Sequence, residues 1–273
     1  MSRSQLVTAS VGANFLLHFT TFTINNMREV TFVMPVYGNS GQARAAVATV
    51  REFLPDVTIF IVDDASPEDV DRVALRRLAL DHNAEYRRMP ENVGQSGAIN
   101  AGVSFAGTPY VVIMDNDVTL YGNEWLHDHI GILNRDARIV AVSGCSNPDF
   151  KDDHAETYHY ADACCESAYC EFPASGILTL KTSTAREFPF PVGHPGMWPD
   201  SIWEVGLIRA GRVMYTSKAA AHHHDNTNHY QGSHYRQDCI AYLAEYGKDV
   251  LKPRRSRQEV RHFMTNGEWP CSQ

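Results

Sequence analysis

Short apolar runs alternate with longer amphipathic segments through the middle of the chain. The first apolar run, Val30–Val36, is rich in β-branched residues and is followed by helical spacing near 40–53. The pattern then predicts, in order, a strand at 57–62, a helix beginning at Pro67, a strand at 84–88, a helix at 95–105 and a strand at 110–114. Strands that alternate with helices are typical of βαβ units, so we expect an α/β fold with a mostly parallel central sheet flanked by helices.

The alternation weakens after residue 118. The pattern still predicts a helix at 125–133, strands at 139–142 and 175–180, a helix near 200–210 and a strand from 213 to the histidines at 222–224. Residues 145–173 have no clear period and are expected to form a long surface loop or lid. We predict one large domain at 27–224, made of the halves 27–118 and 119–224, with an amino-terminal extension at 1–26 and a helical tail at 225–273.

Charge is distributed unevenly along the chain. The 273 residues include 24 Lys and Arg and 32 Asp and Glu, a net charge of −8, which gives no general attraction to nucleic acid or anionic lipid. Seven acidic residues and a single lysine lie at 145–173, whereas six basic and two acidic residues lie at 248–262. The commonest role of such a basic run is a solvated helix face, and a contact with a phosphate backbone or an anionic membrane is the alternative.

Cysteine usage and hydropathy indicate the compartment. The six cysteines lack the paired spacing of a zinc site, and a chain of this length needs no disulfide bonds to fold, so we expect a reducing, cytoplasmic setting. No apolar run reaches the roughly 18 residues of a membrane-spanning helix. We therefore expect a soluble protein, or one that is peripheral to a membrane.

Polar residues follow three of the predicted strands at the point where each strand ends. These groups are Pro35-Val-Tyr37-Gly38, Asp63-Asp64-Ala-Ser66 and Asp115-Asn116-Asp117. In open parallel sheets the ligand crevice lies at the carboxyl ends of the strands, so the three groups are expected at one edge. The alternative for any one group is that its aspartates form turns and cap helices.

The Asp115-Asn116-Asp117 group has the chemistry of a metal site. Two carboxylates two residues apart beside a strand end can converge on one hard cation, and oxygen ligands suit Mg²⁺ or Mn²⁺. Such a cation would bridge the phosphates of a nucleotide and neutralise a departing diphosphate.

Four motifs occur in a fixed order between these strands and helices. They are Val-Met-Pro35-Val-Tyr37, Ile-Val-Asp63-Asp64-Ala-Ser66, Glu-Asn92-Val-Gly94-Gln-Ser-Gly-Ala-Ile-Asn100-Ala-Gly102 and Ile-Met-Asp115-Asn-Asp117. With the later pieces Ala174-Ser-Gly176 and Arg209-Ala-Gly211, they resemble the inverting family 2 glycosyltransferases, which have the GT-A fold. The resemblance runs from about residue 30 to 224. It implies a nucleotide-sugar half at 27–118 and an acceptor half at 119–224.

The resemblance also implies roles for single residues. Tyr37 would line the base pocket, Asp64 would accept a hydrogen bond from the nucleobase, and Asp63 would contact the nucleotide or the loop around it. A helix cap is the alternative for Asp64, and a plain turn glycine is the alternative for Gly94. The complete set expected to bind the donor is Pro35, Tyr37, Asp63, Asp64, Asn92, Gly94, Asn100, Asp115 and Asn116.

A catalytic base is expected shortly before Ala210-Gly211. The family places there the Asp of a Glu-Asp pair, which deprotonates the attacking hydroxyl, and the matching residue is Asp200. This chain has Pro199 in place of the glutamate, and Glu204, one helical turn later, is the second candidate. An amino-terminal helix cap is the alternative role for Asp200.

The metal site of the family is often completed by a histidine after a late strand. Here His222, His223 and His224 follow that strand, and spacing alone does not choose among them. Matching the family's distance favours His223, with His224 as a further candidate. The expected ligand set is thus Asp115, Asp117, His223 and His224, holding Mn²⁺ or Mg²⁺.

These features predict a metal-dependent glycosyltransferase that moves a sugar from a nucleotide-diphosphate donor, a UDP-sugar, to an acceptor hydroxyl with inversion. The acceptor is left open among a glycan, a protein and a modified nucleic-acid base, and the segments 145–173 and 248–262 are hypothesised to recognise it. One alternative is a nucleotidyltransferase of the same fold class, although Gly38-Asn-Ser-Gly41 lacks the basic residue expected there. The other alternative is a non-catalytic module that binds a nucleotide or glycan.

Overall fold

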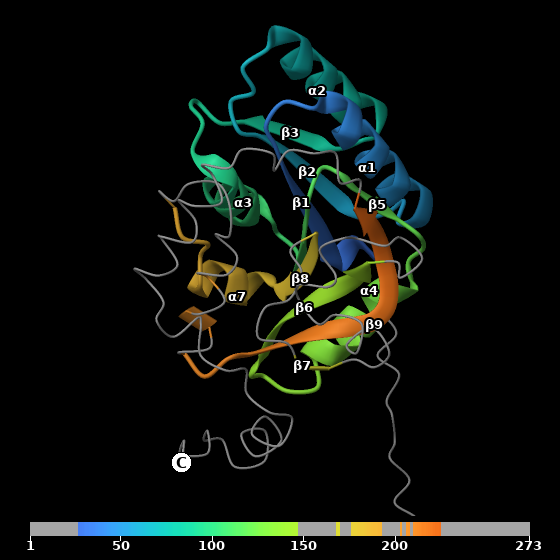
Figure 1. Ribbon diagram of the computed structural model, residues 1–273, viewed down its shortest axis with the longest axis vertical. Helices are drawn as coiled ribbons and strands as arrows, with labels where there is room; N and C mark the ends of the chain where they lie inside the picture. Colours follow the sequence, from blue (N-terminus) through green and yellow to red (C-terminus); the bar gives the residue numbers. More distant parts are fainter. Residues whose placement is uncertain are drawn as a thin grey trace, which may run out of the picture.

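The computed structural model describes residues 27–146, 168–169, 176–192, 203, 206–207 and 210–224 (Figure 1). Its strands and helices follow one another in this order: η1 (Met27–Glu29), β1 (Val30–Val36), α1 (Ser40–Phe53), β2 (Thr58–Asp63), α2 (Asp69–Asp81), β3 (Glu85–Arg88), α3 (Gly94–Phe105), β4 (Tyr110–Met114), β5 (Val118–Leu120), α4 (Glu124–Leu133), β6 (Ile139–Ser146), β7 (Ala168–Tyr169), β8 (Ile177–Lys181), α7 (Thr182–Glu187) and β9 (Val213–His224). They form an α/β fold around one mixed sheet.

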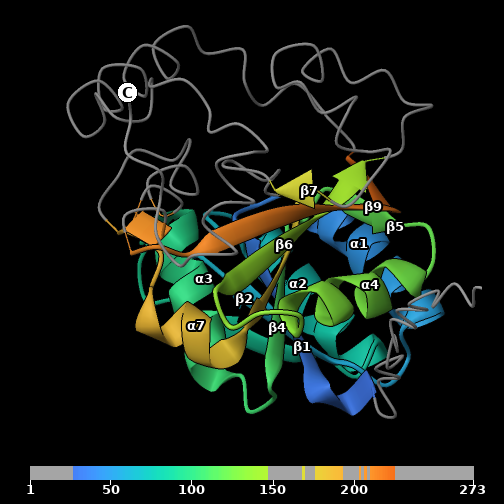
Figure 2. The ribbon, with the colours of Figure 1, turned by 90° about the horizontal axis from the view of Figure 1, so that it is seen from below.

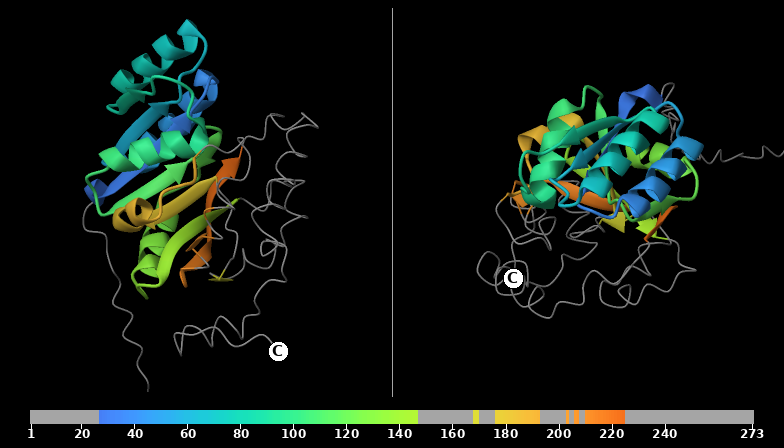
Figure 3. Two further views of the ribbon diagram at one scale, coloured as in Figure 1. Left: turned by 90° about the vertical axis from the view of Figure 1, so that its left-hand side faces the viewer. Right: turned by 90° about the horizontal axis from the view of Figure 1, so that it is seen from above.

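The sheet has the strand order β3-β2-β1-β4-β8-β6-β9-β5, and β7 pairs with β9. The first four strands of this order are parallel to one another. Antiparallel pairs begin where β8 meets β4, and a parallel pair returns between β6 and β9. In the left view of Figure 3 the early strands lie above and the later strands below. The parallel part is thus the half of the sheet that carries the predicted donor site.

Helices cover both faces of the sheet because its strands are apolar on both sides. Phe32 and Met34 of β1 pack on the face covered by α1, α2 and α4. Val33, which points to the other side, packs against α3 and belongs to the core cluster that also includes Trp203. Figure 2 shows the two layers, with α3 and α7 on one side of the strands and α1 and α4 on the other. Such continuous burial explains why the strands read as unbroken apolar runs rather than alternating ones.

Helix α3 packs unusually close to the sheet. Gly102 lies against β1 and β2, and a Cβ added to it would collide with Val33 and lie 3.1 Å from Val62 Cγ2. A glycine is therefore required here by close approach rather than by a turn. This packing sets the position of the amino-terminal end of α3, which faces the carboxyl ends of β2 and β4.

Most of the elements expected from the sequence are confirmed. The helix expected to begin at Pro67 instead begins at Asp69. Four short elements, η1, β5, β7 and α7, were not expected. Within the segment 145–173, expected to be irregular, the structure describes 145–146 and 168–169, which are strand: β6 continues to Ser146 and β7 lies at Ala168–Tyr169. Both pair with β9, a partner far along the chain, so local periodicity could not show them.

Candidate functional site

The three polar groups predicted after strands lie at one edge of the sheet. Strands β1, β2 and β4 are parallel neighbours, so their carboxyl ends face the same way. Val36 is in register with Asp63, which sets the Tyr37 loop beside the Asp63-Asp64 loop. Tyr37 is 52% exposed and follows β1 directly. Pro35 is buried in β1 beyond the last residue that pairs with β4, where its missing N–H breaks no pair with that strand.

Asp64 lies almost completely buried at the end of β2. Its backbone N–H donates to Val36 O at 2.8 Å, and its Oδ1 accepts a hydrogen bond from Val93 N at 2.8 Å. Burial raises the pKa of the Asp64 carboxyl above its ordinary value, and hydrogen bonds from the backbone of Val93 and Gly94 oppose this only in part. The carboxylate is thus fixed in place by the start of α3.

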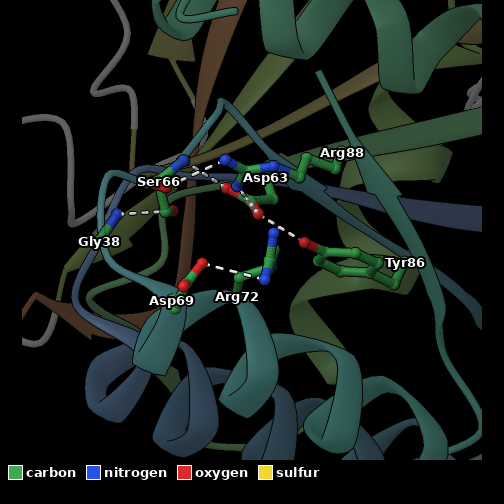
Figure 4. A network of polar contacts seen from close by, with 7 residues as sticks. All are labelled: Gly38, Asp63, Ser66, Asp69, Arg72, Tyr86 and Arg88. Atoms are coloured by element: carbon green, nitrogen blue, oxygen red, sulfur yellow. Dashed lines mark hydrogen bonds and ion pairs between the residues drawn. The ribbon is translucent and has the colours of Figure 1, made fainter. Parts of the chain in front are cut away.

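Asp63 has a different environment, although it is the next residue. Its side chain is 0% exposed. It accepts hydrogen bonds from Ser66 N at 2.8 Å, Tyr86 Oη at 2.5 Å and Arg88 Nη1 at 2.6 Å (Figure 4). Burial alone would raise its pKa, but the hydrogen bonds from Ser66, Tyr86 and Arg88 outweigh burial and hold the pKa below its ordinary value. Asp63 therefore organises the loop, whereas Asp64 is the carboxylate set against α3.

The first turn of α3 joins two of the predicted groups. Val93 N donates to Asp64, and two residues later Gln95 Nε2 donates to Asp115 Oδ1 at 2.9 Å. Gly94 lies between them with φ +78, a conformation that favours glycine, and its N–H donates to Asn92 Oδ1 at 3.0 Å. The end of β2 and the end of β4 are thus held to one helix start.

Asp115, Asn116 and Asp117 form the short connection between β4 and β5, and all three are partly buried. Asp115 N donates to Gly176 O at 3.1 Å, and Val118 N donates to Asp115 O at 3.4 Å. Strand β5 then pairs with β9 so that Val118 lies opposite His224 and Thr119 opposite His223. The backbone register therefore brings the histidine run to the strand that begins directly after Asp117.

The described part of the chain contains no group of three His, Cys, Asp or Glu side chains arranged to hold a metal ion. For the histidine run the structure describes the backbone, which gives the register but not the ligands. The metal assignment to Asp115, Asp117, His223 and His224 thus stays a prediction.

Asn100 lies further along α3 and has a clear structural contact. Its Nδ2 donates to Phe190 O at 2.7 Å, and its Oδ1 accepts from Phe190 N at 2.9 Å. Phe190 in turn stacks on Trp203 with ring centroids 4.5 Å apart. This pair of hydrogen bonds ties α3 to the segment after α7, and the expected contact of Asn100 with the donor stays a prediction.

Several predicted residues lie outside the described residues. They are Asp200 and Glu204, the extension at 1–26, most of 145–173 and the tail at 225–273 with its basic run. Trp203, between the two candidate bases in sequence, is buried, and its Nε1 donates to Phe188 O at 2.6 Å.

Sequence reasoning missed Ser66, Tyr86, Arg88 and Gln95 as parts of this edge. Ser66 appeared only as a member of a motif, and the other three were assigned no role. Arg88 is the Cα partner of Asp63 in the β2 and β3 pair, a register that only the folded sheet reveals. The available signal was the polar sequence of β3, Glu85–Arg88, beside the apolar strand β2.

The sequence model of glycosyl transferase family 2 matches residues 31–194, which contain all three strand ends and the start of α3. The chain belongs to this family. A curated relative, beta-1,4 N-acetylgalactosaminyltransferase 1 of Rattus norvegicus, is 30% identical over 107 residues. That match covers 39% of this chain and 18% of the relative, so the chain spans about a fifth of the relative's length.

Solved structures of glycosyltransferases share the fold of this family 2 member. A mannosyltransferase from Pyrobaculum calidifontis, in complex with GDP-Man and Mn²⁺, superposes with a TM-score of 0.64 at 19% identity, covering 84% of this chain and 66% of the other. S. aureus TarS 1–349 with UDP-GlcNAc gives 0.58 at 14% identity, with 87% and 74% covered. Glucosyl-3-phosphoglycerate synthase of Mycobacterium tuberculosis, with Mn²⁺ and UDP, gives 0.56 at 14% identity, with 80% of each chain covered. The expected GT-A fold is confirmed.

No helix in the described part of this glycosyltransferase domain has the length and apolar character that crossing a bilayer demands.

Proposed function

We propose that this family 2 member transfers a sugar from a nucleoside-diphosphate sugar, a UDP-sugar, to an acceptor hydroxyl with inversion at the sugar carbon. The observation that carries the proposal is the junction at the start of α3, where Val93 holds Asp64 and Gln95 holds Asp115. A base-binding carboxylate and a phosphate-side carboxylate are thereby fixed relative to each other. The distant structural relatives bound to GDP-Man, UDP-GlcNAc and UDP support a nucleotide donor.

The donor is proposed to lie along the carboxyl edge of the parallel strands. The exposed ring of Tyr37 would stack on the base, and Asp64 would accept a hydrogen bond from a ring N–H. Gly94 would let the backbone approach the ribose or phosphate, because no side chain occupies the space there. Asn92, Asn116 and Pro35 complete the proposed lining.

A divalent cation fits the residues at the end of β4. Asp115 and Asp117 are hard oxygen donors two residues apart, and the register brings His223 and His224 to the adjacent strand. These residues would hold Mn²⁺ or Mg²⁺, which would supply charge to offset the diphosphate as it leaves. Gln95 keeps the Asp115 carboxylate oriented through its 2.9 Å hydrogen bond.

Proton removal from the acceptor is proposed for Asp200, with Glu204 as the second candidate. Attack by the acceptor oxygen on the sugar carbon breaks the bond to the diphosphate, and the acceptor proton passes to the carboxylate. The Phe190–Trp203 stack lies next to this segment in sequence and is tied to α3 through Asn100. The half at 119–224 would therefore bring the base to the donor held by 27–118.

The proposal predicts that Asp117→Ala abolishes the metal-dependent activity. The experiment measures hydrolysis of UDP-sugars and GDP-sugars with Mn²⁺ and again with EDTA, because many transferases pass sugar slowly to water. Wild-type protein should hydrolyse one of these donors only with the cation. The variant should lose at least about a hundredfold in rate, since Asp117 would help to hold the cation, and a cation that offsets the diphosphate charge in a water-excluded site contributes several kcal/mol to the transition state.

Asp81→Ala is the matched control, because Asp81 lies on α2 in an exposed ion pair with Arg77. This variant should hydrolyse the donor at the wild-type rate. Nucleotide binding without turnover in the wild type would instead indicate a binding module. Equal turnover with EDTA and Mn²⁺ would overturn the metal assignment.

A further inference from the structure

We propose that Arg88 and Tyr86 of β3 are positioning residues for the nucleotide base, acting through Asp63 and Ser66 without touching the donor. The inference rests on the proposed function and names how its base subsite is held. Arg88 Nη1 donates to Asp63 Oδ2 at 2.6 Å, and its Nη2 donates to Ser66 O at 3.1 Å. One guanidinium therefore spans both ends of the loop that contains Asp64.

The network in Figure 4 also extends to the loop that carries Tyr37. Ser66 Oγ accepts a hydrogen bond from Gly38 N at 2.9 Å, and Ser66 N donates to Asp63 Oδ1 at 2.8 Å. The two groups proposed to meet the base, Tyr37 and Asp64, are thus each one residue from an atom of this network. A change at Arg88 would reach both through Asp63 and Ser66.

The loop needs this support because its backbone is strained. Ala65, between Asp64 and Ser66, has φ +57, which is rare for a residue with a side chain. A non-glycine residue keeps this conformation only where the surroundings impose it. The hydrogen bonds of Asp63 and Ser66 on either side of Ala65 supply that constraint.

The location of Arg88 distinguishes a role in positioning the loop from a role in packing the core. Its side chain is 32% exposed at the end of an edge strand, and its guanidinium donates to Asp63 and Ser66 of the loop at 63–66. The preceding Arg87 provides a matched comparison on the same strand. Arg87 lies over the rings of Phe60 and Phe105 and forms an ion pair with Glu85, away from the loop.

The test measures binding of UDP and GDP with Mn²⁺ by isothermal titration calorimetry in wild type, Arg88→Ala and Arg87→Ala. We expect Arg88→Ala to weaken nucleotide binding roughly tenfold, because loss of a charge-assisted hydrogen bond frees the loop. Arg87→Ala should bind the nucleotide as wild type does. Millimolar guanidinium should restore part of the affinity of Arg88→Ala and leave Arg87→Ala unchanged, an effect that general destabilisation would not show.

A milder variant keeps the proposal testable if Arg88→Ala does not fold. Tyr86→Phe removes one hydroxyl from Asp63, and we expect nucleotide binding to weaken by about threefold. Donor KM in the hydrolysis assay should rise with kcat nearly unchanged, since the reacting carbon lies at the far end of the donor.

Hydrogen exchange separates this inference from the proposed function. In ligand-free protein, Arg88→Ala should exchange faster than wild type at the amides of Gly38 and Ser66, which the network protects. Faster exchange in a protein that binds neither UDP nor GDP would overturn the proposed function while confirming the network. Nucleotide affinity equal to wild type in both Arg88→Ala and Tyr86→Phe would overturn the positioning role.

Discussion

Asp63 and Asp64 are neighbours in sequence but have opposite electrostatic environments. Both are buried, yet Asp63 receives hydrogen bonds from Ser66, Tyr86 and Arg88, and its pKa is lowered. Asp64 receives backbone hydrogen bonds only at the start of α3, and burial keeps its pKa raised. The charged form of Asp63 thus has its partners within the fold, whereas the charged form of Asp64 gains most from a ligand that donates a hydrogen bond to it.

The strain at Ala65 predicts that Ala65→Gly stabilises the protein. Left-handed backbone at a residue with a Cβ costs about 1–2 kcal/mol, and glycine removes this cost. Part of the resulting stabilisation is lost because glycine also gives the unfolded chain more conformational freedom. The free energy of unfolding from urea titration should rise by roughly 0.5–1 kcal/mol. Ala45→Gly, on the exposed side of α1, is the control and should lower the same quantity by about 1 kcal/mol. A lower unfolding free energy in Ala65→Gly would show that φ at this position carries no strain.

The sequence predicted the location of a residue correctly where that location depends on a strand end. Tyr37, Asp64 and Asp115 lie at the expected edge because the carboxyl ends of parallel strands necessarily meet there. Gln95 and Arg88 could not be predicted. Their contacts depend on the pitch of α3 and on the register of β3 against β2, and neither is encoded in local periodicity.

At the scale of elements, α3 links the hydrophobic core to the site. Its buried residues pack on β1 and β2, and its first turn holds Asp64 and Asp115. The sequence predicted this helix within one residue, because its apolar positions recur with helical spacing. The sequence did not predict how closely it lies on the sheet.

The close approach of α3 predicts that Gly102→Ala lowers both the stability of the protein and its affinity for UDP. The added methyl would collide with Val33, and such overpacking costs about 1–3 kcal/mol, more than the roughly 1 kcal/mol that alanine gains in a helix. We expect the unfolding free energy to fall by about 1 kcal/mol, and UDP affinity to fall as the first turn shifts. Gly131→Ala in α4 has open space for its methyl and should stabilise the protein by up to about 1 kcal/mol. Unchanged nucleotide affinity in a destabilised Gly102→Ala would separate helix packing from the site.

At the scale of the whole molecule, the fold divides into a part that local pattern predicts and a part that it does not. The parallel strands β3, β2, β1 and β4 are joined by helices, and β2, β1 and β4 form near-continuous apolar runs, so their order follows from βαβ rules. Beyond β4 the sheet is built from distant partners, such as β6 with β9 and β5 with β9. Those pairings depend on tertiary contacts, which is why β5, β7 and the extension of β6 were not predicted.

The pKa of Asp63 predicts how global stability depends on pH. Because the pKa of this carboxyl is lower in the folded state than in the unfolded chain, its stabilising effect is present above about pH 4 and is lost as pH falls through the folded pKa. Asp63→Asn removes the charge, and we expect it to lower the unfolding free energy near pH 7 by about 1.5–3 kcal/mol, the range for hydrogen bonds to a charged group.

Urea titrations of wild type and Asp63→Asn at several pH values between 7 and 3 give this difference directly, since other carboxylates titrate alike in both proteins. The difference in unfolding free energy between wild type and Asp63→Asn should narrow as the pH falls below about 4, because only wild type has the Asp63 charge to lose. Asp136→Asn is the comparison: hydrogen bonds from Arg138 lower the pKa of Asp136, but that ion pair lies within one turn and is partly exposed. The difference in unfolding free energy between wild type and Asp136→Asn should be smaller than that for Asp63→Asn at every pH. A gap for Asp63→Asn that stays constant down to pH 3 would mean that the fold responds to the shape of this side chain and not to its charge.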